Sequence, residues 1–157
     1  MNVMTIHTSP QGEQIANKTI EIDAPTSKVW DALTDPELMK KWMADAETEI
    51  NITTDWTVGN PMIISGKLHR IKFKNLGTVL QFEREKILTY SHLSSLSRLP
   101  DEPKSYSVME FRLVPVENRT NLELTLSNFP TESILKHLVF YWNVTLELLK
   151  KMIEEQA

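Results

Sequence analysis

The chain has 157 residues, which suits one domain with a sizeable core, because chains of about 150 residues bury around two thirds of their unfolded surface. Its 17 Lys and Arg residues against 21 Asp and Glu residues give a net charge of −4, so we expect no nucleic-acid binding. The absence of cysteine excludes disulfides, thiol nucleophiles and thiolate metal sites.

Residues 1–14 are polar and mixed, and Ser9, Pro10 and Gly12 mark a turn, so we predict a tail or an edge strand. Residues 15–157 are predicted to form a single domain. The stretch from Met1 to Glu13 lacks the basic and then apolar order of a signal peptide, and no segment has about 18 uninterrupted apolar residues. We therefore expect a cytoplasmic protein without a membrane span.

The next segment predicts a strand followed by two short helices. Apolar and polar residues alternate from Thr19 to Asp23, as in a strand with one buried face. Pro25 suits a first helical position, and helical spacing then places three apolar residues on one face: Val29, Trp30 and Leu33. Asp35 suits an N-cap and Pro36 a first turn, so a second helix is predicted to run to about Trp42 or Met43.

Six further strands are predicted from apolar residues at every second position. The inward positions are Met62 with Ile64, Ile71 with Phe73, Leu80 with Phe82, Leu88 with Tyr90, Met109 with Phe111 and Leu113, and Leu122 with Leu124 and Leu126. The stretch from Ser94 to Lys104, with two prolines, is the longest irregular insertion. Such loops serve as lids, as partner contacts or as solvated surface.

The last segment, from Thr131 to Glu155, predicts one long amphipathic helix. Thr131 suits the N-cap, and helical spacing forms one apolar stripe: Leu138, Trp142, Leu146, Leu149 and Ile153. At about 1.5 Å per residue this helix would be roughly 36 Å long, enough to cross a small domain. We predict an α+β fold in which a curved antiparallel sheet of about six to seven strands surrounds this helix, with the two short helices after the first strand.

Several groups of residues resemble the START-like (SRPBCC, helix-grip) superfamily over about residues 16–156. The opening helix pair carries one group: Ala24, Pro25, Val29, Trp30, Ala32, Leu33, Thr34, Asp35, Pro36, Glu37 and Trp42. A second set is similar to the family named for the C-terminal domain of the activator of the heat-shock protein 90 ATPase: Trp56, Val58, Gly59, Gly77, Thr78, Val79, Leu99, Pro100, Asp101, Pro103, Pro130, Thr131, Trp142, Leu146 and Leu149.

This resemblance implies three classes of function. Superfamily members commonly hold small hydrophobic molecules between the sheet and the long helix, and some members are cyclases or hydratases. The chaperone activators of eukaryotes contain the domain as well, which implies a chaperone or another protein as a partner. Family relatives include monomers and dimers, so both a monomer and a homodimer are open.

We predict a ligand site in the space between sheet and helix, because bulky aromatic groups either close such a space or line a pocket. The candidate ligand-binding residues are Trp30, Trp42, Met43, Phe82, Tyr90, His92, Phe111, Phe129, Trp142 and Leu146. For Trp30 and Leu146 a purely structural role in the core is the simpler interpretation. Tyr90 and His92 point to the same face of one strand, and a polar group there needs a partner, water or a ligand. The alternative for His92 is a solvated position at the rim of the sheet.

The chain offers few signs of catalysis or cofactor binding. The other histidines are dispersed, and with 4 Gly it contains neither a nucleophile elbow nor a phosphate-binding loop, so no catalytic residue, metal or cofactor is predicted. The leading hypothesis is non-enzymatic binding of a small hydrophobic or aromatic molecule. The alternatives are a protein-interaction module using Ser94 to Lys104 and the outer sheet face, and a cyclase or hydratase in which His92 acts with Tyr90 or Tyr106.

Overall fold

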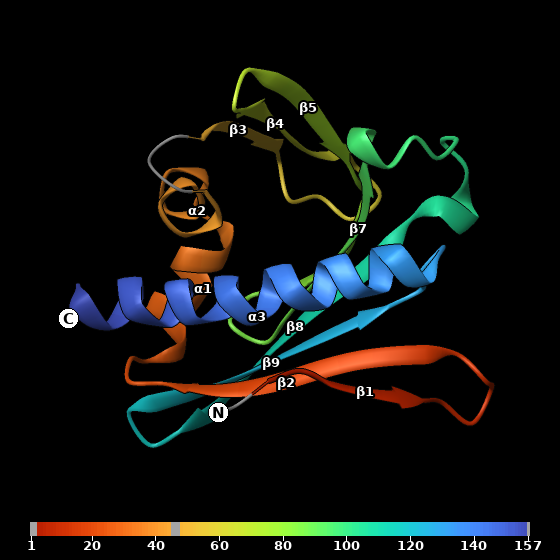
Figure 1. Cartoon of the computed structure of the whole chain (residues 1–157). Helices are drawn as coiled ribbons and strands as arrows, with labels where there is room; N and C mark the ends of the chain where they lie inside the picture. The colour runs from red at the N-terminus through yellow and green to blue at the C-terminus, as the bar shows by residue number, and fades with distance from the viewer. Residues whose placement is uncertain (1–2, 45–47, 157) are drawn as a thin grey trace.

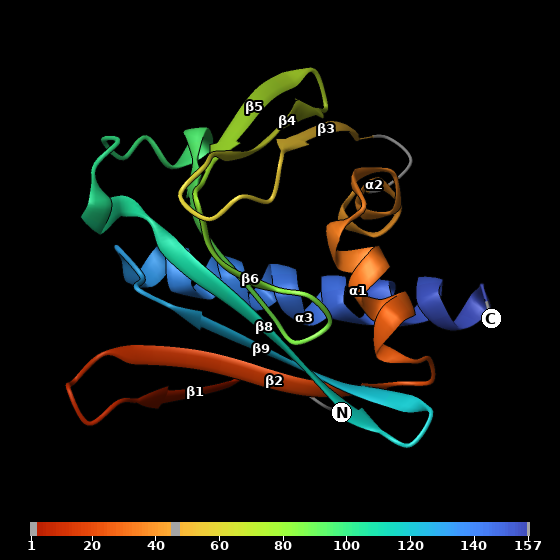
Figure 2. The ribbon, with the colours of Figure 1, turned by 180° about the vertical axis from the view of Figure 1, so that it is seen from behind.

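The structure is a computed structural model that describes residues 3–44 and 48–156. Residues 1–2 of the predicted N-terminal segment, and residues 45–47 and 157 of the predicted domain, lie outside the described residues. Figures 1 and 2 show the long helix α3 (Glu132–Glu155) crossing one face of a curved sheet, in front of β8 and β9 in one view and behind them in the other.

Within the described residues the sheet has nine strands, and every neighbouring pair is antiparallel. Its order is β1-β2-β9-β8-β7-β5-β4-β3, and β6 pairs separately with β7. The predicted fold class is therefore confirmed. The strands are β1 (Thr5–Thr8), β2 (Gln14–Ile22), β3 (Glu49–Thr54), β4 (Met62–Leu68), β5 (Ile71–Leu76), β6 (Val79–Glu83), β7 (Ile87–Ser94), β8 (Ser107–Val116) and β9 (Arg119–Ser127).

Two strands, β1 and β3, are additional to the seven that the sequence pattern predicts. They lie at the two ends of the strand order. β1 pairs with β2 through Ile6 opposite Ala16, so the described part of the N-terminal segment contributes an edge strand. β3 contains two alternating apolar residues, Ile50 and Ile52, among polar ones, so the prediction missed a pattern as long as that of Met62 with Ile64. β3 is stabilised by pairing with β4.

The short helices form as predicted, apart from a shift of one residue. α1 (Thr26–Thr34) begins after Pro25, which is extended and occupies the N-cap. α2 (Pro36–Met43) begins at its predicted N-cap, where the Asp35 carboxylate accepts a hydrogen bond from the Glu37 backbone N–H at 2.9 Å. None of the helices in the described ranges is long and apolar enough to cross a membrane.

The predicted inward faces of two strands are wrong in part, because Ile71 and Leu80 are exposed. Ile71 pairs with Leu68 at the tip of the β4–β5 hairpin, away from the strands on which α3 lies (Figure 1). In β6 the register shifts between Val79 and Gln81, so Val79 is buried and Leu80 turns outward. The irregular insertion contains two single 3-10 turns, η1 (Ser95–Ser97) and η2 (Pro103–Ser105).

The core lies between α3 and the sheet, and the predicted apolar stripe of α3 is buried in full. The Thr131 hydroxyl caps this helix by accepting a hydrogen bond from the Ile134 backbone N–H at 3.1 Å. Trp142 is only 3% exposed, and its ring centroid lies 5.5 Å from that of Phe111 and 6.2 Å from that of Trp42. Trp142 therefore joins α3 to both β8 and α2.

We expect Trp142→Ala to lower the free energy of unfolding by about 3 to 5 kcal/mol, because it removes a buried ring with several aromatic neighbours. Urea denaturation followed by circular dichroism measures this change. Val58→Ala at an exposed loop position is the control and should stay within about 0.5 kcal/mol of the wild type. A loss below about 1 kcal/mol for Trp142→Ala would contradict the burial of this ring between α3, β8 and α2.

Candidate functional site

The predicted site residues separate into a buried group and a half-buried group. Trp30, Trp42, Tyr90, Phe111, Trp142 and Leu146 are buried. Met43, Phe82, His92 and Phe129 are half-buried. Nine of these ten residues pack in the core or against it, and His92 is the exception.

The rings of this core contact one another in two clusters. Phe82 stands between Trp30 and Trp56, with centroids 5.1 and 5.6 Å away. In the second cluster Phe111 lies between Tyr90, at 6.0 Å, and Trp142, at 5.5 Å. Such centroid separations are those of aromatic rings in direct contact. Side chains therefore occupy this part of the space in which the sequence pattern placed a ligand.

Backbone carbonyls satisfy the polar atoms of Trp56 in the first cluster and of Trp42 and Tyr141, whose rings pack against Trp142 of the second. The Trp42 indole N–H donates to the Ala32 carbonyl at 2.8 Å, and the Trp56 indole N–H donates to the Thr34 carbonyl at 2.7 Å. The Tyr141 hydroxyl donates to the Met43 carbonyl at 3.0 Å. These aromatic groups need no ligand to complete their hydrogen bonding.

A hollow of about 310 Å³ lies where α3 begins, which we call the His92 hollow. The end of β7, the insertion, the start of β8 and the first turns of α3 meet there, at one end of the molecule in Figures 1 and 2. Its lining residues are His92, Leu93, Ser94, Leu96, Ser97, Ser105, Ser107, Ser133, Ile134, His137 and Leu138. This volume lies at the lower end of the range for small-molecule sites.

The lining of the His92 hollow combines apolar groups with hydrogen-bonding groups. Leu93 and Leu138 are buried and Ile134 is half-buried, so they form an apolar floor. Five serines and two histidines supply hydroxyl and imidazole groups around it. A hollow of this kind suits a mainly apolar molecule that carries a few polar atoms.

The imidazole of His92 is held in its neutral form at physiological pH. Burial, with a smaller contribution from the charge of His137, lowers its pKa from 6.5 to about 4. A neutral imidazole has one donor and one acceptor nitrogen. Within residues 3–44 and 48–156 the imidazole makes no hydrogen bond, so both nitrogens are available to a bound molecule.

Sequence reasoning named His92 and the insertion but missed the remaining walls of this hollow. The insertion was expected to be a lid, a partner contact or solvated surface, and Ser94, Leu96 and Ser97 line the hollow. His137 follows His92 by 45 positions, and no spacing pattern joins the two. The one available signal was that Ile134 and His137, one turn apart on α3, share a side of its first turns.

The two phenols predicted to assist His92 in acid–base chemistry have raised pKa values. Burial raises the pKa of Tyr90 far above its usual range. Burial and a 2.6 Å hydrogen bond to the Asp101 carboxylate raise the pKa of Tyr106 to about 12. General acid–base catalysis works best with a pKa near the operating pH, so neither phenol is tuned for it. The cyclase or hydratase hypothesis stays a prediction.

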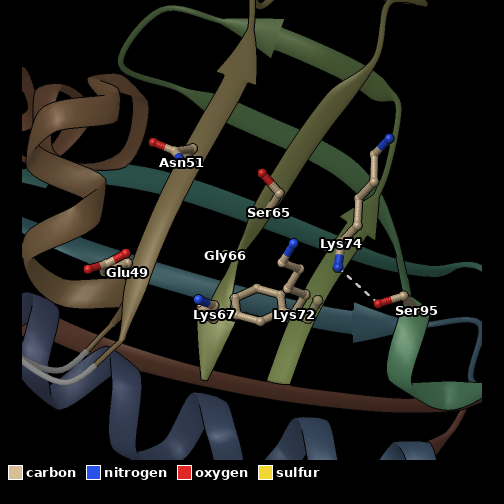
Figure 3. Close-up of a pocket in the computed structure, with 9 residues that line it drawn as sticks. Glu49, Asn51, Ser65, Gly66, Lys67, Lys72, Lys74 and Ser95 are labelled. Atoms are coloured by element: carbon tan, nitrogen blue, oxygen red, sulfur yellow. Dashed lines mark hydrogen bonds between the residues drawn. The ribbon is translucent and has the colours of Figure 1, made fainter. Parts of the chain in front are cut away.

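A second hollow, of about 530 Å³, lies on the outer face of β3, β4 and β5, and its lining carries three lysines and one carboxylate, that of Glu49 opposite Lys67 (Figure 3). Lys67 on β4 stands directly opposite Lys72 on β5, and Lys74 follows on the same face. No carboxylate of the described residues forms an ion pair with these three ammonium groups. We call this surface the lysine face.

The fold defines a class of protein. A curved antiparallel sheet around a long C-terminal helix, with two short helices after the first long strand, is the START-like helix-grip fold. The model of the family described as Activator of Hsp90 ATPase homolog 1-like protein matches residues 23–154, and the chain belongs to this family. The predicted resemblance is confirmed.

Solved structures with the same fold come from several bacteria. A protein of Cytophaga hutchinsonii (ChR145) is 37% identical, with a TM-score of 0.75 over 90% of this chain and 94% of its own. CalU16 of Micromonospora echinospora is 25% identical, with a TM-score of 0.69 over 99% of this chain and 87% of its own. CV1439 of Chromobacterium violaceum, at 18% identity and a TM-score of 0.76, covers 89% of this chain and 96% of its own, and it shows the fold alone. No curated protein matches the chain.

We expect His92 to make stability fall as the pH drops from 6.5 to 4. In this window the unfolded chain binds a proton at His92 that the folded chain does not, so the stabilisation is complete above pH 6.5 and lost towards pH 4. The loss should reach at most about 1.4 kcal/mol per pH unit. Urea unfolding at pH 7 and pH 5 should show a smaller pH effect for His92→Gln than for the wild type.

The matched control for this measurement is His7→Gln, which removes an exposed imidazole on β1. Its pH dependence should equal that of the wild type. If His92→Gln also kept the full wild-type pH dependence, the assignment of a desolvated, neutral His92 would be wrong.

Proposed function

We propose that the protein binds a small, mainly apolar molecule with a hydrogen-bonding group in the His92 hollow. The observation that carries this proposal is a neutral imidazole, free of hydrogen bonds within the described chain, beside an apolar floor. Of the ten predicted ligand-binding residues, His92 would contact the ligand directly. The packed rings would form the rigid interior behind the hollow.

Apolar burial would supply most of the binding free energy, at about 25 cal/mol per Å². A ligand that buries about 200 Å² of apolar surface would gain roughly 5 kcal/mol before the cost of association is subtracted. A hydrogen bond to His92 would add about 1 kcal/mol and would orient the ligand. We therefore expect binding that is weak to moderate and that strengthens with ligand hydrophobicity.

The test is a thermal-shift panel of flavonoids, fatty acids and polyketides followed by calorimetric titration. A ligand that binds the folded state should raise the melting temperature by mass action. Ile134→Trp should fill the hollow and abolish the shift. Lys136→Trp adds the same ring two positions further on, at an exposed site outside the hollow, and should retain the shift. No shift of the wild type at saturating ligand would exclude the proposal.

The lysine face favours a second function, which is binding to an acidic surface of a partner protein. Like charges opposite each other on neighbouring strands are destabilising. Lys67 has Glu49 opposite it on β3, whereas Lys72 and Lys74 on β5 have no carboxylate opposite them, so an incoming carboxylate would mainly compensate these two lysines. The chain as a whole is acidic, so this basic face is distinctive. The family is named for an activator of a chaperone ATPase, which makes a chaperone the first partner to test.

For this function we expect salt-sensitive binding of a purified Hsp90-type chaperone in a surface-binding assay. The double variant Lys72→Glu, Lys74→Glu should weaken binding at least tenfold. Lys28→Glu, Lys86→Glu makes the same change of charge at exposed positions outside the lysine face and should bind like the wild type. If the wild type showed no binding at about 100 µM, a concentration that detects even a weak complex, the proposal would be excluded.

A further inference from the structure

The solvent side of α3 carries an apolar ridge. Phe140 is 73% exposed, Val144 50% and Leu148 47%, and they follow one another at intervals of four residues. Residues at this spacing form a continuous row along a helix. The opposite side of α3 is the buried stripe, so the helix is apolar on two sides instead of the usual one.

A hollow of about 440 Å³ lies at the C-terminal end of this ridge, which we call the Met152 hollow. Ala44, Leu148 and Met152 provide its apolar walls, and Lys41, Lys151, Glu155 and Gln156 surround them. Phe140 and Met152 are 12 positions apart in sequence, which is about 18 Å along the helix. A protruding ring and an apolar hollow thus lie on one surface.

We propose that two copies of the chain pair through this surface, with their α3 helices antiparallel. The two-fold axis passes between Val144 and Leu148, so Phe140 of each copy enters the Met152 hollow of the other. Val144 of one copy then faces Leu148 of the second. Each contact occurs twice, as required for an isologous dimer, the commonest symmetric assembly.

The charges around the ridge fit this arrangement. An antiparallel pairing brings Lys136 and His137, near the start of one helix, towards Glu155 at the end of the other. Glu155 makes no ion pair within the described chain, and Lys136 pairs only with Glu132, at 3.6 Å. The positive end of each helix dipole also lies beside the negative end of its neighbour. Two parallel helices would instead bring like charges and like helix ends together.

The extent of the ridge limits the strength of the dimer. A stable standard-size interface buries about 800 Å² on each partner, and a ring such as Phe140 supplies 150 to 250 Å² of this at most. The ridge and the Met152 hollow together span about 18 Å of one helix. We therefore expect a reversible dimer with a dissociation constant in the micromolar range.

Sedimentation velocity of the full chain between about 1 and 200 µM, the range of such weak equilibria, tests the proposal. The mass should rise with concentration from 18.1 kDa towards twice that value. Phe140→Asp should raise the dissociation constant at least tenfold, whereas Val58→Asp at an exposed loop position should leave it unchanged. A wild type that stays monomeric, or a Phe140→Asp variant that dimerises normally, would overturn it.

Disulfide trapping tests the register, since the chain has no cysteine of its own. Val144→Cys and Leu148→Cys chains, mixed and oxidised, should cross-link to each other faster than either cross-links to itself. Equal rates for the mixed and the separate chains would overturn the antiparallel pairing. Circular dichroism of each variant checks that it is folded. The apolar contacts of the dimer lie outside the His92 hollow, with which they share no residue, so the dimer needs no ligand there.

Discussion

The rest of the structure depends on the burial of one stripe of α3 against a curved sheet. Trp142 is the central residue of this contact, because its ring meets Phe111 of β8 on one side and Trp42 of α2 on the other. Interiors are packed at close to crystal density, so rings in contact leave little room among themselves. The His92 hollow lies away from these rings, at the start of the helix, where side chains from β7, the insertion, β8 and α3 meet without filling the space.

The rotation of α3 about its own axis decides which residues face each surface, and polar contacts hold this rotation. Lys18 is buried on β2, and its ammonium group lies 3.3 Å from the exposed carboxylate of Glu147. Asn143 accepts a hydrogen bond from the Met4 backbone N–H at 2.8 Å. A buried lysine needs its partner, since an unpaired charge in the interior is costly. With this rotation fixed, Phe140 points to solvent.

Local patterns predicted most of the fold, because period and capping act over a few residues. The buried stripe of α3 and the Asp35 N-cap follow directly from spacing and side-chain chemistry. The outward turn of Leu80 depends on a register shift against β7, which the sequence of β6 alone does not encode. The His92 hollow was harder still, since His92 and His137 meet only through tertiary packing. Whether an aromatic residue closes or lines a space is decided by rotamers and by the position of the neighbouring helix.

The insertion connects the two hollows considered for function. Ser95 lines the hollow of the lysine face, and its hydroxyl accepts a hydrogen bond from the Lys74 backbone N–H at 2.9 Å. Its neighbours Ser94 and Leu96 line the His92 hollow. One short segment thus forms a wall of both sites. A ligand that changed the position of this wall would alter the surface offered to an acidic partner, and by linkage the partner would alter ligand affinity by the same factor.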